Sequence, residues 1–356
     1  MTMNIQELLQ RSVEQNASDI FIIAGQPVTI KVFHQMHTLE EKRLLPDDTR
    51  ILITQIYEFA SNRSQDKLQE KGDDDFSFSI AGLSRFRVST YKQRGSYAAV
   101  IRVISFALPD PESIGIPQNI IKLADIKKGL VLVTGPAGMG KSTTQACMID
   151  YINKTYAKHI ITLEDPIEHL HSHKKSIVSQ REISIDSESY VNALRAVLRQ
   201  APDVILLGEM RDYGTINIAL TAAETGHTVI STLHTLGAAT TIDRIIDVFP
   251  ANQQHQVRLQ LAMSLETVIS QQLVPSADGK LIPVFEIMNT TPAIKNLIRE
   301  NKIHQIDAML TSSGNSTMTS MENSLYELYK KGNITQETAL LYATNPEVMK
   351  RKLNIR

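Results

Sequence analysis

A glycine-rich segment between an apolar run and a helix-forming run constrains this chain more than any other feature. Residues 135–142 have the sequence GPAGMGKS, which fits the pattern G-x-x-x-x-G-K-[ST] of a phosphate-binding loop. Glycines let successive backbone N–H groups turn toward a phosphate group. Lys141 would then contact the β- and γ-phosphates of a triphosphate, and the Ser142 hydroxyl would bind Mg²⁺. The expected binding residues are Gly135, Pro136, Ala137, Gly138, Met139, Gly140, Lys141, Ser142 and Thr143.

The pattern around this loop predicts an α/β unit with a parallel sheet. Near-continuous apolar strands that alternate with helices are typical of a parallel sheet covered on both faces. The expected strands are Gly129–Thr134, His159–Leu163, Val204–Leu207 and Thr228–Thr232. The expected helices are Lys141–Lys154, Ser187–Arg199 and Tyr213–Thr225. Functional groups are then expected at the carboxyl ends of the strands.

The strand expected at 204–207 leads into an acidic residue at its carboxyl end. Glu209 lies where a carboxylate could polarise a water for in-line attack on a γ-phosphate, if this strand neighbours the loop. Asp203 lies at the opposite end of the strand and is not expected to bind magnesium. The alternative for Glu209 is an ordinary surface acid.

A second strand also ends in carboxylates, Glu164 and Asp165. Paired carboxylates beside a triphosphate usually hold water or metal rather than contact phosphate oxygens directly. Glu164 is therefore a candidate ligand of Mg²⁺ through water. The alternative is an acidic turn before Pro166.

Histidines flank the strand expected at 228–232. His227 and His234 lie one at each end, and a neutral His234 at the catalytic edge could report phosphate occupancy through a hydrogen bond. A zinc site is the rival interpretation, but two histidines lack the third and fourth ligands. The tract 169–173, which contains three histidines, is a weaker metal candidate and is interpreted as a solvated loop.

Arginines are frequent where an enzyme acting on a triphosphate could use them. Arg195 and Arg199 are four residues apart and are expected on one face of a helix. An arginine from a neighbouring subunit can stabilise the charge of the transition state. The other candidates are Arg211, Arg85, Arg87, Arg94 and Arg102.

The chain outside this unit is expected to form a small α+β part at the N-terminus and a helical part at the C-terminus. In the first part we expect strands at 19–24, 28–33, 76–80, 84–91 and 97–104, a helix at 48–59 and a turn at 73–75. Prolines and a glycine in residues 108–117 predict a linker. The expected divisions are residues 1–107, the linker 108–118, the parallel-sheet core 119–289 and the helical region 290–356.

Composition excludes several classes of protein. The formal net charge is −1, so no global basic field would attract nucleic acid, and no nucleic-acid partner is expected. The single cysteine, Cys147, cannot form an internal disulfide or a four-cysteine zinc site. No apolar run approaches the roughly 18 residues needed to span a bilayer. We therefore expect a cytoplasmic chain without direct membrane insertion.

Four segments, taken in this order, resemble the ATPase superfamily of type II and type IV secretion systems. They are the loop at 135–143, ITLEDPIE (161–168), VILLGEMRD (204–212) and TGHTVISTLHT (225–235). Residues 16–32 and 78–96 resemble the PAS-like N-terminal domain of that family, so the resemblance covers nearly the whole chain. Within the superfamily the sequence is most similar to the retraction ATPases of type IV pili. AIKNLIRE (293–300) is similar to their AIRNLIRE signature, and the chain lacks the cysteine cluster of extension motors.

The resemblance implies an ATP-hydrolysing homohexamer of RecA-like subunits that powers pilus retraction in twitching motility. It would be cytoplasmic, peripheral to the inner face of the cell membrane, and its partner would be an inner-membrane pilus platform protein. By position, Glu209 would be the catalytic glutamate and Glu164 its partner in the acidic box. The phosphate-sensing arginines of the family would be Arg87, Arg102, Arg195, Arg199 and Arg211.

The sequence departs from the family at three places, and other functions stay open. In the loop, Met139 and Ala137 replace the usual serine and threonine. Leu236 and Gly237 stand where the family has Asn-Ser, and Ser276 follows QQLVP (271–275), where the family often has arginine. The alternatives are a pilus extension ATPase, a type II/IV secretion ATPase, or a nucleotide-gated scaffold without turnover. Glu209 disfavours the scaffold, because a pure binder needs no group that activates water.

Overall fold

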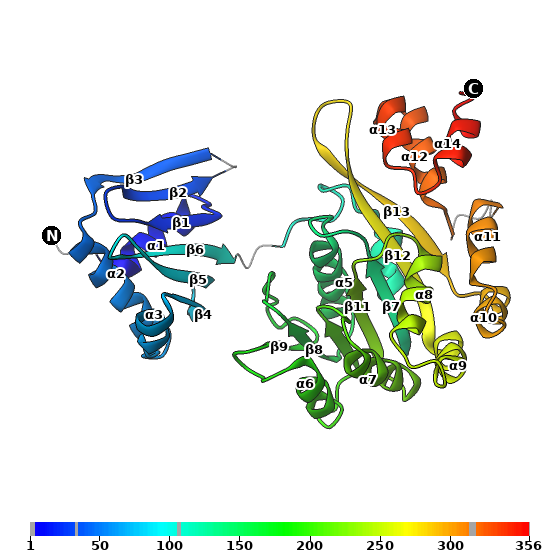
Figure 1. Ribbon diagram of the computed structural model, residues 1–356, viewed down its shortest axis with the longest axis horizontal. Coiled ribbons are helices and arrows are strands. Elements are labelled where there is room, and N and C mark those ends of the chain that lie inside the picture. Colours follow the sequence, from blue (N-terminus) through cyan, green and yellow to red (C-terminus); the bar gives the residue numbers. More distant parts are fainter. Residues whose placement is uncertain (1–3, 33–34, 105–107, 313–317, 356) are drawn as a thin grey trace. The chain divides into compact units, whose positions relative to one another are not determined.

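The computed structural model describes two compact units of the chain. The described residues are 4–32, 35–104, 108–312 and 318–355. The first unit comprises residues 1–107 with 168–170, and the second comprises residues 108–167 and 171–356. Figure 1 shows the helices and strands of each unit. Each unit has its own hydrophobic core.

The first unit is a six-stranded antiparallel sheet packed with helices, in the strand order β3-β2-β1-β6-β5-β4. Its strands are β1 (Asp19–Ile22), β2 (Pro27–Val32), β3 (Gln35–Arg43), β4 (Asp73–Ile80), β5 (Ser84–Gln93) and β6 (Ser96–Ile104). Its helices are α1 (Ile5–Glu14), α2 (Pro46–Phe59) and α3 (Asp66–Lys71). In β5 the buried Phe86 and Val88 alternate with the exposed Arg87, which confirms the predicted strand.

Two expectations for this unit differ from the structure. The strand β3 was not predicted, because most of its residues are polar and exposed. The acidic run Asp73–Asp75 is the start of β4 and not a turn, so that prediction is wrong. Phe33, the expected end of the second strand, lies outside the described residues.

Asp73–Asp75 can begin a strand because the side chain of Asp74 is buried and forms ion pairs. Its carboxylate accepts from Arg63 Nε (2.9 Å) and lies 3.0 Å from Lys67 Nζ. Burial alone would raise the pKa of Asp74, but the hydrogen bonds from the two cations outweigh burial and lower it. A paired carboxylate is therefore compatible with a buried strand position.

The second unit contains a seven-stranded sheet in the order β13-β12-β7-β11-β10-β8-β9. All neighbouring strands pair in parallel except β12 and β13, which are antiparallel. The strands are β7 (Gly129–Thr134), β8 (His159–Glu164), β9 (Ile177–Glu182), β10 (Val204–Leu207), β11 (Thr228–Leu233), β12 (Leu265–Pro275) and β13 (Leu281–Asn289). The four strands expected from the sequence are confirmed. The strands β9, β12 and β13 were not predicted.

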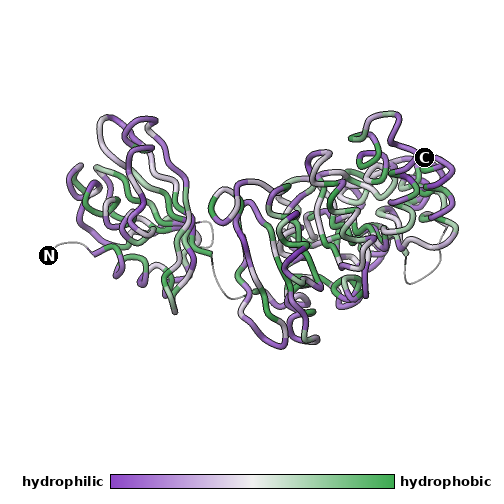
Figure 2. Tube along the Cα trace, turned by 90° about the horizontal axis from the view of Figure 1, so that it is seen from below, coloured by the Kyte–Doolittle hydropathy of each residue, from purple (hydrophilic) through white to green (hydrophobic). Residues whose placement is uncertain are grey.

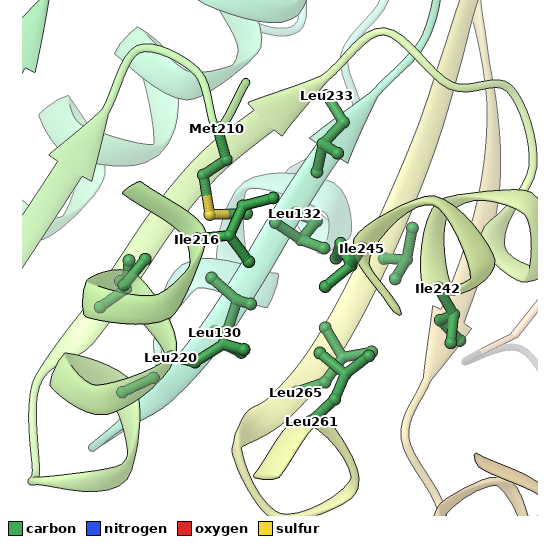
Figure 3. Close-up of a cluster of buried hydrophobic side chains, with 14 of the residues drawn as sticks. Leu130, Leu132, Met210, Ile216, Leu220, Leu233, Ile242, Ile245, Leu261 and Leu265 are labelled. Atoms are coloured by element: carbon green, nitrogen blue, oxygen red, sulfur yellow. The ribbon is translucent and has the colours of Figure 1, made fainter. Parts of the chain in front are cut away.

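Helices cover both faces of this sheet. They are α4 (Gln118–Ile121), α5 (Lys141–Thr155), α6 (Tyr190–Val197), α7 (Tyr213–Glu224), α8 (Ala238–Asp247), α9 (Gln254–Ser264) and α10 (Pro292–Arg299). Leu130 and Leu132 of β7 pack with residues of α7, α8 and α9 on one face (Figure 3). Val131 and Val133 of the same strand pack with α5 on the other face. Both faces are therefore apolar, as the parallel sheet requires. In Figure 2 hydrophobic segments lie inside this unit and hydrophilic ones gather at its outer turns.

The region beyond β13 is helical in its described part. After α10 it contains α11 (Ile306–Ser312), α12 (Met321–Lys330), α13 (Gln336–Leu341) and α14 (Pro346–Lys352). In α10 the side chains of Ile294 and Ile298 are fully buried, and Leu297 is half-buried against the same core. This face of the AIKNLIRE segment therefore packs in the interior.

Two further observations concern the surroundings of the core. Residues 108–117, the expected linker, form no helix or strand, and α4 begins directly after them.

No helix within the described residues is long and apolar enough to cross a bilayer.

Glu286 of β13 is a buried carboxylate that joins two helix N-termini. Its Oε1 accepts from the Ala238 N–H at the start of α8 (2.8 Å), and its Oε2 accepts from the Met321 N–H at the start of α12 (3.3 Å). Burial raises the pKa of Glu286 to about 7, the two N–H groups oppose this rise, and the charges of Asp307 and Glu322 add to it.

We therefore expect Glu286 to make stability depend on pH in a defined window. Between about pH 4.5 and 7 the folded protein keeps a proton that the unfolded chain releases, so the contribution is full below this window and is lost as pH rises through it. Glu286→Gln, which is neutral throughout, should flatten the slope of Tm against pH between 5 and 7. Thermal unfolding in a buffer series measures this slope. Glu327→Gln, an exposed carboxylate of α12, is the control and should keep it. An unchanged slope in Glu286→Gln would contradict the expectation.

Candidate active site

The loop after β7 turns sharply around three glycines. Gly135, Gly138 and Gly140 have φ of 142°, 78° and 76°, a region that side chains rarely adopt. Gly135 also has no room for a side chain, because a Cβ there would lie 2.2 Å from the carbonyl oxygen of Gln271. The loop leads into α5 at Lys141, so the N-terminus of α5 lies at the loop. Such an arrangement favours an anion.

Lys141 is buried beneath this loop and is bonded to it. Its Nζ donates to the carbonyl oxygens of Gly135 (2.7 Å) and Pro136 (2.8 Å), and it lies 3.5 Å from Nδ1 of His234. Only 7% of the residue is exposed. The ammonium group of Lys141 is thus held at the phosphate-binding loop, as the sequence pattern predicts.

Glu209, which follows β10, is connected to Lys141 through His234. Oε2 of Glu209 is 3.3 Å from Nε2 of His234, and Oε1 is 2.5 Å from Nη2 of Arg211. The segment is fixed to β11, because Thr232 Oγ1 donates to the Gly208 carbonyl (2.6 Å) and Met210 N–H donates to the Thr232 carbonyl (3.1 Å). The hydrogen bond to Glu209 raises the pKa of Arg211.

If His234 is neutral, one of its two tautomers suits both of these contacts. An ammonium group has only donors, so Nδ1 of His234 must accept from Lys141. The ring proton of the neutral imidazole is then on Nε2, which donates to Glu209. His234 therefore connects the lysine of the loop to the carboxylate through opposite sides of one neutral ring.

Glu164 lies at the end of β8, one strand away from Glu209. Its carboxylate accepts from Thr162 Oγ1 (2.6 Å) and Gln180 Nε2 (3.2 Å), and its backbone lies against Gly208. Burial raises the pKa of Tyr190, and the charges of Asp165, Glu209 and Glu164 add to this effect. The charges of these three carboxylates therefore act on the same hydroxyl.

The predicted arginines fall into separate groups. Arg211 is the one that contacts Glu209. Arg195 is exposed on α6, and Arg199 lies beyond the end of that helix, so the expectation of one helix face is wrong for Arg199. The helix ends at Val197, and Arg199 Nη1 donates to the Arg195 carbonyl (3.1 Å).

Arg87 and Arg102 belong to the first unit. They lie directly opposite each other on β5 and β6, and both are exposed. Arg102 Nε donates to Asp19 (3.1 Å).

Three other residues or segments lie away from this edge. Asp203 is at the amino end of β10, where its carboxylate accepts from the His159 N–H (2.8 Å). His227 lies at the opposite end of β11 from His234, so the two histidines cannot share a metal. Among the described residues no three His, Cys, Asp or Glu side chains are grouped as metal ligands, and the tract 169–173 is part of a loop.

A cavity of about 430 Å³ opens beside Glu209. It is lined by Glu209, Arg211 and His234, by apolar residues of β11 and α7, and by Arg244 of α8. Arg244 was not predicted, because nothing in its local sequence separates it from other helical arginines. Thr144 and Gln271, which contact each other below the loop, were also missed.

Comparisons with known proteins show the family of the chain. The family model described as "Type II/IV secretion system protein" matches residues 1–339. The chain belongs to this family.

Two curated relatives align over nearly their whole length. The type IV pilus retraction ATPase PilT of Pseudomonas aeruginosa is 44% identical over 345 residues, which cover 97% of this chain and 99% of the relative. A twitching motility protein of Neisseria gonorrhoeae is 44% identical over 348 residues, covering 97% and 92%. The crystal structure of the pilus retraction motor PilT with bound ADP has a TM-score of 0.89 and 45% identity, covering 98% of this chain and 99% of that one. The resemblance to the secretion ATPases is therefore confirmed.

Loss of the loop lysine should abolish nucleotide binding. Lys141→Ala removes the one ammonium group that bonds to the loop carbonyls, so a bound phosphate group would lose its closest cation. Titration with a fluorescent ADP analogue measures the effect. Lys154→Ala, a change at an exposed lysine of the same helix that pairs with Asp150, is the control and should bind normally. Retained binding in Lys141→Ala would contradict this assignment of the loop.

Proposed function

We propose that this chain is an ATP-hydrolysing motor subunit that powers the retraction of type IV pili. The observation that carries the proposal is the series of contacts from the loop through Lys141 and His234 to Glu209. It joins a phosphate-binding loop to a carboxylate that can activate water. The names of the two curated relatives, a retraction ATPase and a twitching motility protein, support retraction as the output.

The loop residues fit a nucleotide and a magnesium ion. The glycine turn and the N-terminus of α5 suit phosphate oxygens, and Lys141 supplies a buried positive charge. Ser142, in the first turn of α5, and Glu164, through water, are the residues that would hold Mg²⁺. The ion would neutralise charge on the phosphate oxygens.

Glu209 is the residue that we assign to the activation of water. Its carboxylate would accept the proton of the attacking water, and the hydrogen bond from His234 would orient it. Arg211 pairs with the other oxygen of Glu209, and that oxygen keeps a second lone pair that water can use. Opening of this ion pair would release the guanidinium group. Arg211 would then be able to contact phosphate oxygens.

The remaining assignments concern the ring and its surroundings. We propose a homohexamer in which Arg87, Arg102, Arg195 and Arg199 sense phosphate, some of them on a neighbouring subunit. Residues 1–107 would be the PAS-like domain, 108–118 the linker, 119–289 the RecA-like core and 290–356 the helical region. The ring would work in the cytoplasm, at the inner face of the membrane, on a pilus platform protein, without nucleic acid.

The role of Glu209 predicts a separation of binding from turnover. Glu209→Gln keeps the size and one acceptor of the side chain but removes the base, so ADP binding should be retained and ATP hydrolysis should fall at least about 10²-fold. Steady-state phosphate release and a fluorescent ADP titration measure the two quantities. Glu224→Gln, at the end of α7, is the control and should hydrolyse normally. Hydrolysis by Glu209→Gln at the wild-type rate would exclude this mechanism.

Catalysis across subunits predicts partial rescue in mixed rings. If Arg102 acts on a neighbour, then Arg102→Ala and Glu209→Gln are each inactive alone but, when mixed, form some interfaces with both groups intact. Hydrolysis should therefore recover in part after mixing, and specific activity should rise with protein concentration. If a species that sediments as a monomer hydrolysed ATP at a rate independent of concentration, catalysis across subunits would be refuted.

The output is tested in cells. Deletion of the chain should leave pili present but unable to retract, because extension would not need this subunit. Electron microscopy of surface pili and a twitching assay separate the outcomes. Absence of pili would favour an extension or secretion ATPase instead.

A further inference from the structure

A buried glutamine on β12 lies directly below the phosphate-binding loop. Gln271 is 1% exposed, and its side chain makes two hydrogen bonds. Its Nε2 donates to the Met139 carbonyl in the loop (2.7 Å), and its Oε1 accepts from Thr144 Oγ1 in the first turn of α5 (2.7 Å). One amide therefore joins the loop to the helix that follows it.

The two contacts fix the orientation of this amide. The Met139 carbonyl can only accept, so the NH₂ group of Gln271 must face it. The oxygen then faces the Thr144 hydroxyl, which donates. Leucine lacks both groups, and glutamate lacks the donor, so glutamine is the side chain of this length that satisfies both partners.

The loop also packs closely on the backbone and side chain of the same residue. A Cβ on Gly135 would lie 2.2 Å from the Gln271 carbonyl oxygen, and a Cβ on Gly140 would lie 3.1 Å from Gln271 Nε2. Both ends of the glycine turn therefore contact Gln271, while Met139 bonds to it between them.

We propose that Gln271 is a positioning residue for nucleotide binding, which holds the loop in the shape that receives phosphate. Glycines with positive φ have great conformational freedom, so an unsupported loop would lose entropy when it closes on a phosphate group. A loop already tied at its Met139 carbonyl and to α5 has lost most of that entropy during folding. Nucleotide binding then costs less conformational entropy, which is the general effect of preorganisation.

The next residue on the strand supplies a matched control. Gln272 points to the opposite face of the sheet, as successive strand residues do, and its Nε2 donates to the Tyr342 carbonyl (2.9 Å). It is 7% exposed, so it is a second buried amide, and its partner is a backbone carbonyl outside the loop. Substitution of Gln272 should lower the free energy of unfolding, because a buried hydrogen bond is lost, but it should leave the phosphate-binding loop intact.

The experiment measures ADP affinity in four proteins: wild type, Gln271→Leu, Thr144→Val and Gln272→Leu. Titration of each full-length protein with a fluorescent ADP analogue yields Kd, and the rise in Tm on addition of ADP is an independent measure. We expect Kd to rise about tenfold or more in Gln271→Leu, because the hydrogen bonds to the Met139 carbonyl and to Thr144 are both lost. Thr144→Val should shift Kd in the same direction, whereas Gln272→Leu should stay within about twofold of wild type.

Each outcome decides the proposal. It is supported if the Thr144 and Gln271 variants weaken ADP binding and the Gln272 variant does not. It is overturned if Gln271→Leu binds ADP like wild type, or if Gln272→Leu weakens binding equally. Should Gln271→Leu fail to fold, Thr144→Val removes the other end of the same contact and decides alone. The inference rests on the proposed nucleotide site, and a wild-type protein that binds no ADP would refute that site first.

Discussion

The parallel pairing of β7, β11, β10 and β8 is the constraint on which the rest of the site depends. Because parallel strands end at one edge of a sheet, the residues that follow them meet there. Thr134 of β7 lies opposite Leu233 of β11, so Gly135 and His234 continue side by side. Glu209 follows β10, the next strand. Residues that are distant in the sequence are therefore brought together by strand order and not by local turns.

The position of His234 between Lys141 and Glu209 has an electrostatic consequence. If Glu209 paired directly with Lys141, an arriving phosphate group would have to compete with a full negative charge for the ammonium group. Instead, Lys141 bonds to the neutral carbonyls of Gly135 and Pro136, which a phosphate oxygen can displace more easily. His234 keeps the carboxylate near the loop without a direct ion pair between Glu209 and Lys141.

The sequence predicted the parts of this structure whose local pattern carries their chemistry. The loop, its four central strands and the position of Glu209 follow from a glycine pattern and from apolar runs that end in polar residues. The strands β12 and β13 escaped prediction because buried polar residues such as Gln271 and Glu286 interrupt their apolar pattern. The inward direction of Asp74 was also invisible, since its cationic partners lie in another segment.

The buried polar residues of β12 and β13 bind the backbone of neighbouring segments. Ser270 of β12 lies opposite Glu286 of β13, and together they hold the start of α8: Ser270 Oγ accepts from the Gly237 N–H (2.9 Å), and Glu286 accepts from the next N–H. Gly237 follows His234 by three residues. On the neighbouring position of β12, Gln271 holds the phosphate-binding loop. One hairpin thus supports both segments that contact Lys141, from alternate faces of a strand. A buried polar side chain whose partner is the backbone of a loop limits the movement of that loop, which an apolar residue at the same position could not do.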